Sequence, residues 1–165
     1  MVVEKFVEVN GTTLRYLDWG ADERRTFVML HGIHGHAREW DRLAEAVRLI
    51  RRPLAPEMRG HGDSARNPSG EYSVLEYVTD VGKFIASLGL GPVDLMGHSL
   101  GGIIGIALAA MNPDAVERLI VVDIGPDPAE EGINAIRDPA GSRPLAFDDL
   151  DAAYRWALEG DSLAD

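Results

Sequence analysis

The stretch that most constrains the fold of this chain is Gly97–Gly102, which reads Gly-His-Ser-Leu-Gly-Gly. An apolar run at 93–96 precedes it, and a run of small and apolar residues at 103–110 follows it. This order predicts a strand, a sharp turn with Ser99 at its apex, and a helix, a unit that we call the elbow. Such a turn exposes a serine oxygen above a parallel sheet and directs a helix N-terminus at it. We therefore interpret Ser99 as a nucleophile, with a simple helix-capping serine as the alternative.

Two further segments support this interpretation. Residues 27–35 form an apolar run that leads into a His-Gly turn, and residues 56–64 form a loop after a short strand at 53–55. With these motifs, the chain resembles the α/β-hydrolase superfamily, and most closely its small-molecule esterase, lactonase and C–C hydrolase branch. The resemblance covers nearly the whole chain but matches only the N-terminal part of that family's fold.

The order of the predicted elements indicates an α/β fold. Residues 5–9 and 13–18 alternate around Asn10-Gly11, which predicts a hairpin. Strands and helices then alternate, which predicts a three-layer sandwich with a mostly parallel sheet, a partial α/β-hydrolase fold. The later strands are expected at 26–30, 53–56, 93–96 and 119–122, and the helices at 40–50, 74–88, 103–110 and 148–158. We expect the strand at 119–122 to be buried on both faces, and the second helix to carry Leu75, Val78, Val81, Ile85 and Leu88 on one face.

The sequence changes character after Pro126. Residues 127–143 are acidic and rich in proline and glycine, before the helical pattern at 148–158 begins. The resembled family inserts a lid or cap domain at this point of the chain. The resemblance therefore implies that residues 1–126 are the N-terminal part of the hydrolase core and that residues 127–165 begin the lid.

Composition limits the classes of partner. A chain of 165 residues with a net charge of −11 can bury a core but would repel nucleic acids and anionic membranes. The sequence contains no cysteine, which excludes disulfides and thiolate chemistry. It shows no membrane-length apolar run, no metal-ligand cluster and no P-loop lysine, and its N-terminus lacks the pattern of a signal peptide. We expect a cytoplasmic enzyme without cofactor or metal.

A serine nucleophile needs a base, an acid that orients the base, and hydrogen-bond donors for the oxyanion. The elbow supplies the backbone N–H of Leu100 as one donor, and the resemblance implies the N–H of Ile33 as the other. In the family the order along the chain is serine, acid, histidine, but this sequence has no histidine after His98. The resemblance places the acid either at Asp123 or after a later strand. If Asp123 is not the acid, it caps its strand or helps to hold the lid.

The histidines before Ser99 allow two interpretations each. His31 either ties the His-Gly turn together or lines a substrate pocket. His34 and His36 either face substrate or lie in solvent, and His98 is either a packing residue or part of the pocket wall. The resemblance further implies that residues 59–62, which include His61, pin a loop.

A serine at the apex, rather than an aspartate, favours acyl transfer over haloalkane or epoxide chemistry. We expect hydrolysis of a carboxylic ester, lactone or related small acyl substrate. The chain is expected to be incomplete without a C-terminal remainder that carries the catalytic histidine, and to pair with a second polypeptide fragment or with itself. Two alternatives are a catalytically inactive binding protein, and a minimal hydrolase that recruits His31, His34 or His36 as its base.

Overall fold

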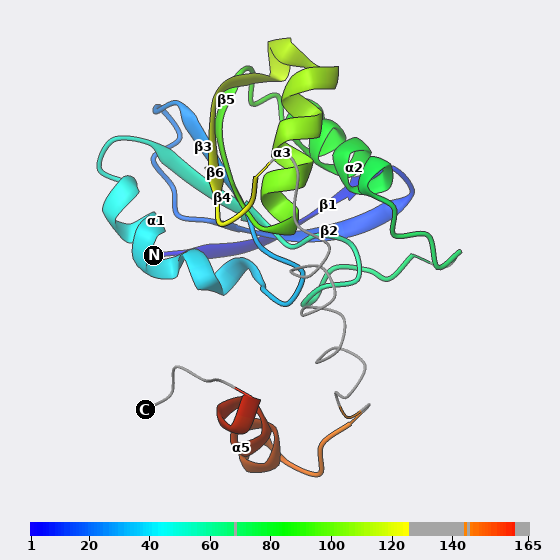
Figure 1. The fold of residues 1–165 in the computed structure, drawn as a ribbon. Coiled ribbons are helices and arrows are strands. Elements are labelled where there is room, and N and C mark those ends of the chain that lie inside the picture. The colour runs from blue at the N-terminus through cyan, green and yellow to red at the C-terminus, as the bar shows by residue number, and fades with distance from the viewer. Residues whose placement is uncertain (68, 126–143, 145, 161–165) are drawn as a thin grey trace. The chain divides into compact units, whose positions relative to one another are not determined.

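The computed structural model of the chain describes residues 1–67, 69–125, 144 and 146–160 (Figure 1). It forms two compact units, Met1–Pro126 and Asp127–Asp165. The first unit contains every site residue that the sequence singles out. Among the described residues, no helix has the length and hydropathy that crossing a bilayer requires.

The first unit is built on a six-stranded sheet with the order β1-β2-β4-β3-β5-β6. Strands β1 and β2 form the predicted antiparallel hairpin, and β4, β3, β5 and β6 run parallel to one another. Asn10 and Gly11 have φ values of 49° and 72°, as a two-residue hairpin turn requires. The strands are β1 Val3–Val9, β2 Thr12–Asp18, β3 Thr26–Leu30, β4 Arg52–Pro56, β5 Val93–His98 and β6 Val116–Val122.

Helices cover both faces of this sheet, which confirms the three-layer prediction. Figure 1 shows α2 and α3 on one face and α1 on the other. Alternate residues of β3 divide between two cores: Val28 and Leu30 pack with α2 and α3, and Phe27 and Met29 pack with Trp40 and its neighbours. The helices are α1 Asp41–Val47, α2 Val74–Ser87 and α3 Leu100–Met111, with short 3-10 turns η1 Ala37–Trp40 and η2 Pro113–Ala115.

Three apolar side chains of the predicted elements are exposed in the structure. Leu75 is 57% exposed, because the first turn of α2 directs Glu76 rather than Leu75 toward the loop after β4. Ile50 is also exposed, since α1 ends at Val47. Strand β6 pairs only with β5 within the described part of the chain, and Ile120 is 47% exposed. The prediction that β6 is buried on both faces is therefore wrong for these residues.

The second unit contributes one described helix, α5 Leu150–Gly160. The Asp149 side chain accepts a hydrogen bond from the Ala152 N–H at 2.7 Å, which satisfies one of the free donors of the first turn. The rings of Phe147 and Trp156 pack 5.7 Å apart. The acidic segment 127–143 lies outside the described residues, and its assignment to a lid stays a prediction.

Candidate functional site

Ser99 lies at the junction of β5 and α3, in the strand–turn–helix order that the sequence predicts. Its φ of 49° and ψ of −114° lie outside the regions that L residues favour, and such a conformation costs on the order of 1–3 kcal/mol. The Ser99 N–H donates to Val122 O at 2.9 Å, and Ser99 O accepts from the Ile103 N–H at 3.1 Å. The neighbouring strand and the helix thus hold the strained turn in place.

The glycines of the elbow are required by close backbone contacts. A Cβ on Gly97 would overlap the backbone of Gly101. A Cβ on Gly101 would in turn overlap the carbonyl of Leu30, at the end of β3. The first turn of α3 therefore lies directly against the ends of β3 and β5, as the glycine pattern predicts.

The loop after β3 meets the elbow at Gly32. A Cβ on Gly32 would lie 3.0 Å from His98 Nδ1 and 3.5 Å from Ser99 Cβ, so the two loops are in contact. Within the part of the chain that the structure describes, the N–H groups of Ile33 and Leu100 have no protein acceptor. Free amides at the start of a helix and in an adjoining loop are the donors that bind an anionic oxygen.

The direction of the Ile33 N–H is set by its own peptide group. The carbonyl of that peptide, Gly32 O, accepts from the Gly35 N–H at 3.0 Å and contacts His31 Nδ1 at 2.7 Å. A trans peptide places its N–H opposite its C=O, so the Ile33 N–H points away from these donors. The Ile33 side chain takes no part in this arrangement and is exposed.

His31 is fully buried beneath this loop. The Met58 N–H donates to His31 Nε2 at 3.0 Å, so the ring carries its hydrogen on Nδ1 and donates to Gly32 O. Burial lowers the pKa of His31 to about 4, because the charged ring would lose its hydration. A neutral ring with both nitrogens occupied ties the turn together. The expectation that His31 lines a substrate pocket does not agree with this burial.

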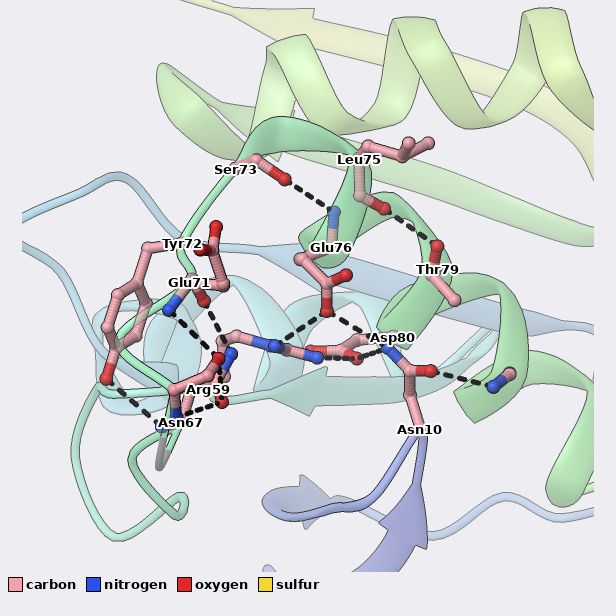
Figure 2. Close-up of polar contacts among 12 residues, drawn as sticks. Asn10, Arg59, Asn67, Glu71, Tyr72, Ser73, Leu75, Glu76, Thr79 and Asp80 are labelled. Carbon is pink, nitrogen blue, oxygen red and sulfur yellow. Dashed lines mark hydrogen bonds and ion pairs between the residues drawn. The ribbon is translucent and has the colours of Figure 1, made fainter.

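Buried ion pairs anchor the loop after β4. Glu57 pairs with Arg15 at 2.6 Å and also accepts from the Asp63 N–H at 2.9 Å. Figure 2 shows the Arg59 guanidinium beside Glu76 and Asp80, and both of its contacts with Asp80 measure 2.6 Å. These contacts fix the backbone of a loop that itself contacts His31.

A group of polar side chains surrounds His98 beside Ser99. His98 Nε2 lies 3.7 Å from a carboxylate oxygen of Asp123, and His98 Nδ1 lies 4.0 Å from one of Glu39. Asp123 directly follows β6 and has a φ of 55°, and its side chain is 86% exposed. Burial raises the pKa of Glu39, with the nearby histidines opposing the shift. Sequence reasoning did not single out Glu39, because it lies in an ordinary polar stretch with no motif.

The two remaining loop histidines are His34 and His36. His36 Nδ1 accepts from the Arg38 N–H at 3.1 Å and so caps η1. His34 is exposed. Among the described residues, no histidine forms a hydrogen bond with Ser99, so these residues do not form a catalytic pair with it here. The roles of Asp123, His34 and His98 in the site stay predictions.

Comparison with known proteins identifies the family. A family model described as "alpha/beta hydrolase fold" matches residues 25–163, most of the chain. The chain belongs to the α/β-hydrolase family. The sequence is 43% identical over 101 residues to the mouse (Mus musculus) protein named "sn-1-specific diacylglycerol lipase ABHD11", covering 60% of this chain and 32% of that protein. It is 32% identical over 137 residues to the Mycobacterium tuberculosis protein named "Esterase Rv0045c", covering 83% and 45%.

A solved structure agrees with this assignment. An α/β hydrolase from Novosphingobium aromaticivorans superposes with a TM-score of 0.85 at 29% identity, covering 96% of this chain and 56% of that one. The chain thus spans between about a third and somewhat more than half of these relatives. The relatives named here are hydrolases, and this places the chain in a family of hydrolytic enzymes.

Proposed function

We propose that this chain carries the nucleophile and the oxyanion donors of a serine hydrolase for carboxylic esters, lactones or related small acyl compounds. The observation that carries the proposal is the strained Ser99 at the head of α3. Beside it lie the amides of Ile33, in the loop after β3, and of Leu100, the first residue of α3, neither of which has an acceptor among the described residues. In the reaction, the Ser99 oxygen bonds to the acyl carbon, its proton passes to the base, and the alcohol leaves with a proton. Water then attacks the acyl-enzyme, releases the carboxylic acid and restores the hydroxyl.

The base for this reaction is proposed to come from outside residues 1–165. The serine hydroxyl is a weak nucleophile unless a base takes its proton, and no described histidine is bonded to it. Within the described residues, β6 has no neighbouring strand on its outer edge, so that edge offers N–H and C=O groups to a polypeptide that extends the sheet. Asp123 follows that strand with an exposed carboxylate, a position from which it could orient an incoming imidazole. Pairing of β6 with a second copy of this chain is the other outcome to be distinguished.

A serine-directed fluorophosphonate tests the nucleophile. The chain is incubated with the reagent, alone and together with a C-terminal polypeptide that carries a histidine, and the labelled residue is located by peptide mass spectrometry. Label on Ser99 that is lost in Ser99→Ala but kept in the surface control Ser69→Ala supports the proposal. Label at another residue, with Ser99 unmodified, would contradict it.

The rival function is a binding protein of the same fold. It is favoured by the lack of a described histidine bonded to Ser99. A binding protein would retain an acyl ligand equally well in the wild type and in Ser99→Ala, and would not turn it over in the presence of the added polypeptide. Ester hydrolysis that depends on Ser99 would exclude it.

A further inference from the structure

The ring of His61 contacts two hydrogen-bond acceptors, whereas the ring of His31 contacts one donor and one acceptor. Its Nδ1 lies 3.1 Å from Arg59 O and its Nε2 lies 2.8 Å from Ile33 O. Both partners are carbonyl oxygens, which only accept, so each contact requires a hydrogen on the ring nitrogen. A neutral imidazole has one such hydrogen, and only the imidazolium form satisfies both contacts.

The groups around His61 either suit a neutral state or already have partners of their own. The ring of His31 lies 4.9 Å away but contacts one donor and one acceptor, which suits a neutral ring. Tyr77 of α2 faces His61 at 6.5 Å, and burial raises the pKa of Tyr77, which keeps it uncharged. The nearby cation on the same loop, Arg59, is already paired with Asp80 and Glu76.

The contact with Ile33 links His61 to the proposed oxyanion site. Ile33 is flanked by two peptide groups, and a histidine holds the carbonyl of each. His31 holds Gly32 O, and His61 holds Ile33 O. With both peptide planes fixed, the φ and ψ of Ile33 are fixed, and so is the direction of its free N–H.

We propose that His61 is a positioning residue whose ring fixes the Ile33 amide for oxyanion binding. The inference rests on the proposed function, because it is that function which makes the Ile33 N–H an oxyanion donor. His61 touches no substrate atom in this role. It transmits the rigidity of the loop after β4 to the loop after β3, 28 residues earlier in the sequence.

The loop after β4 is rigid enough to serve as that fixed point. The backbone N–H of His61 donates to Met58 O at 3.0 Å, and the backbone carbonyl of His61 accepts from the Ser64 N–H at 3.0 Å. The buried pairs of Glu57 and Asp80 hold the loop from two sides. Gly62 has no room for a side chain, since a Cβ there would overlap the Glu57 carboxylate.

Nuclear magnetic resonance of the ¹⁵N-labelled chain tests the inference without requiring activity. At a fixed pH, the ring ¹⁵N signals should show a hydrogen on His61 Nε2, which the contact with Ile33 O requires, and one on His31 Nδ1. A His61 ring whose Nε2 carries no hydrogen would overturn the inference.

Matched variants separate positioning from packing. His61→Phe keeps a ring but has no donor, and His61→Gln keeps one donor. Tyr77→Phe removes a nearby hydroxyl that forms no hydrogen bond with the described residues. We expect the Ile33 amide signal to move most in His61→Phe, less in His61→Gln and not in Tyr77→Phe. Equal spectra of the Ile33 amide in all three would also overturn the inference, and the wild-type ring signals decide the question if His61→Phe does not fold.

Labelling kinetics provide the link to chemistry. The rate of Ser99 modification by the fluorophosphonate should fall about 10- to 100-fold in His61→Phe at saturating reagent, with partial recovery in His61→Gln. The reagent concentration for half-maximal rate should stay unchanged. If wild-type Ser99 is not labelled under any condition, the proposed function fails, whereas the Ile33 amide signals of the variants still decide whether His61 positions Ile33.

Discussion

The buried neutral histidine at position 31 makes the stability of the fold depend on pH. The pKa of His31 is lowered from 6.5 to about 4 in the folded chain, whereas the unfolded chain keeps a value near 6.5. Between these values the unfolded state binds more protons, so the free energy of unfolding falls as the pH decreases. The difference between 6.5 and 4, at about 1.4 kcal/mol for each pH unit, amounts to about 3 kcal/mol. This stabilisation is present above pH 6.5 and is lost as the pH falls toward about 4.

The variant His31→Gln isolates this contribution. A glutamine amide can donate to Gly32 O and accept from the Met58 N–H, but it does not titrate. We expect its free energy of unfolding, measured by urea denaturation at a series of pH values, to lie below that of the wild type at pH 7. The two curves should converge by about 3 kcal/mol between pH 6.5 and 4. Acidic groups with lowered pKa values, such as Asp18, act equally in both proteins and cancel in the difference.

The refuting result is a constant offset between the two curves over this range. It would mean that the His31 ring is protonated in the folded chain, or that the ring is accessible to water. Neither state agrees with a buried ring that accepts from the Met58 N–H and donates to Gly32 O. The shift of the His31 Cε1 proton with pH gives an independent reading of the same equilibrium in the wild type.

Three further predictions concern the elbow and the ion pairs. In the presence of the C-terminal polypeptide that supplies the base, Ser99→Ala and Ser99→Gly should both lower ester turnover by several orders of magnitude. Ser99→Gly should be more stable to urea than Ser99→Ala by about 1 kcal/mol, because φ at this position is 49°, and equal stabilities would argue against strain. Gly101→Ala should lower the free energy of unfolding by about 3 kcal/mol or more, because its Cβ would overlap the Leu30 carbonyl. The control Gly91→Ala has open space around its Cβ but a φ of 64°, so it should lower the free energy of unfolding by about 1–2 kcal/mol in the same urea denaturation. Arg59→Met should lower the free energy of unfolding by about 3–5 kcal/mol, because it leaves the Asp80 carboxylate buried and without its cation. The double variant Arg59→Met with Asp80→Leu should lose less stability, and a larger loss would contradict this prediction.

Local sequence patterns were sufficient to predict most of the elements of the first unit. The Asn10-Gly11 turn and the elbow glycines are determined by backbone geometry, which acts within a few residues. The burial of particular side chains was harder to predict. Ser73 accepts from the Glu76 N–H, as a capping box requires, but the Glu76 carboxylate pairs with Arg59 and Asn10. A partner that lies 66 residues away in the sequence cannot be found from a local pattern.

The backbone positions of the candidate site could be predicted from the sequence, but the contacts of its histidine side chains could not. The position of Ser99 at a strand–helix turn follows from the pattern around it, and the loop containing Ile33 follows from the family resemblance. The state of His31 was not predictable, because it depends on Met58, 27 residues later, whose N–H occupies Nε2. The two histidines that hold Ile33 look alike in sequence, yet one contacts a donor and an acceptor and the other contacts two acceptors.

The contacts of the five histidines narrow the possible sources of a base within this chain. His31 has no free lone pair, and His61 contacts two carbonyl oxygens, so neither ring can accept a proton from Ser99 without losing the contacts that shape the Ile33 loop. The His36 lone pair caps η1. A base recruited from within the chain would therefore have to be His34 or His98. Of these, His98 already lies between the carboxylates of Glu39 and Asp123. In a minimal hydrolase, the His98 ring would therefore have to turn toward Ser99, the next residue in the sequence.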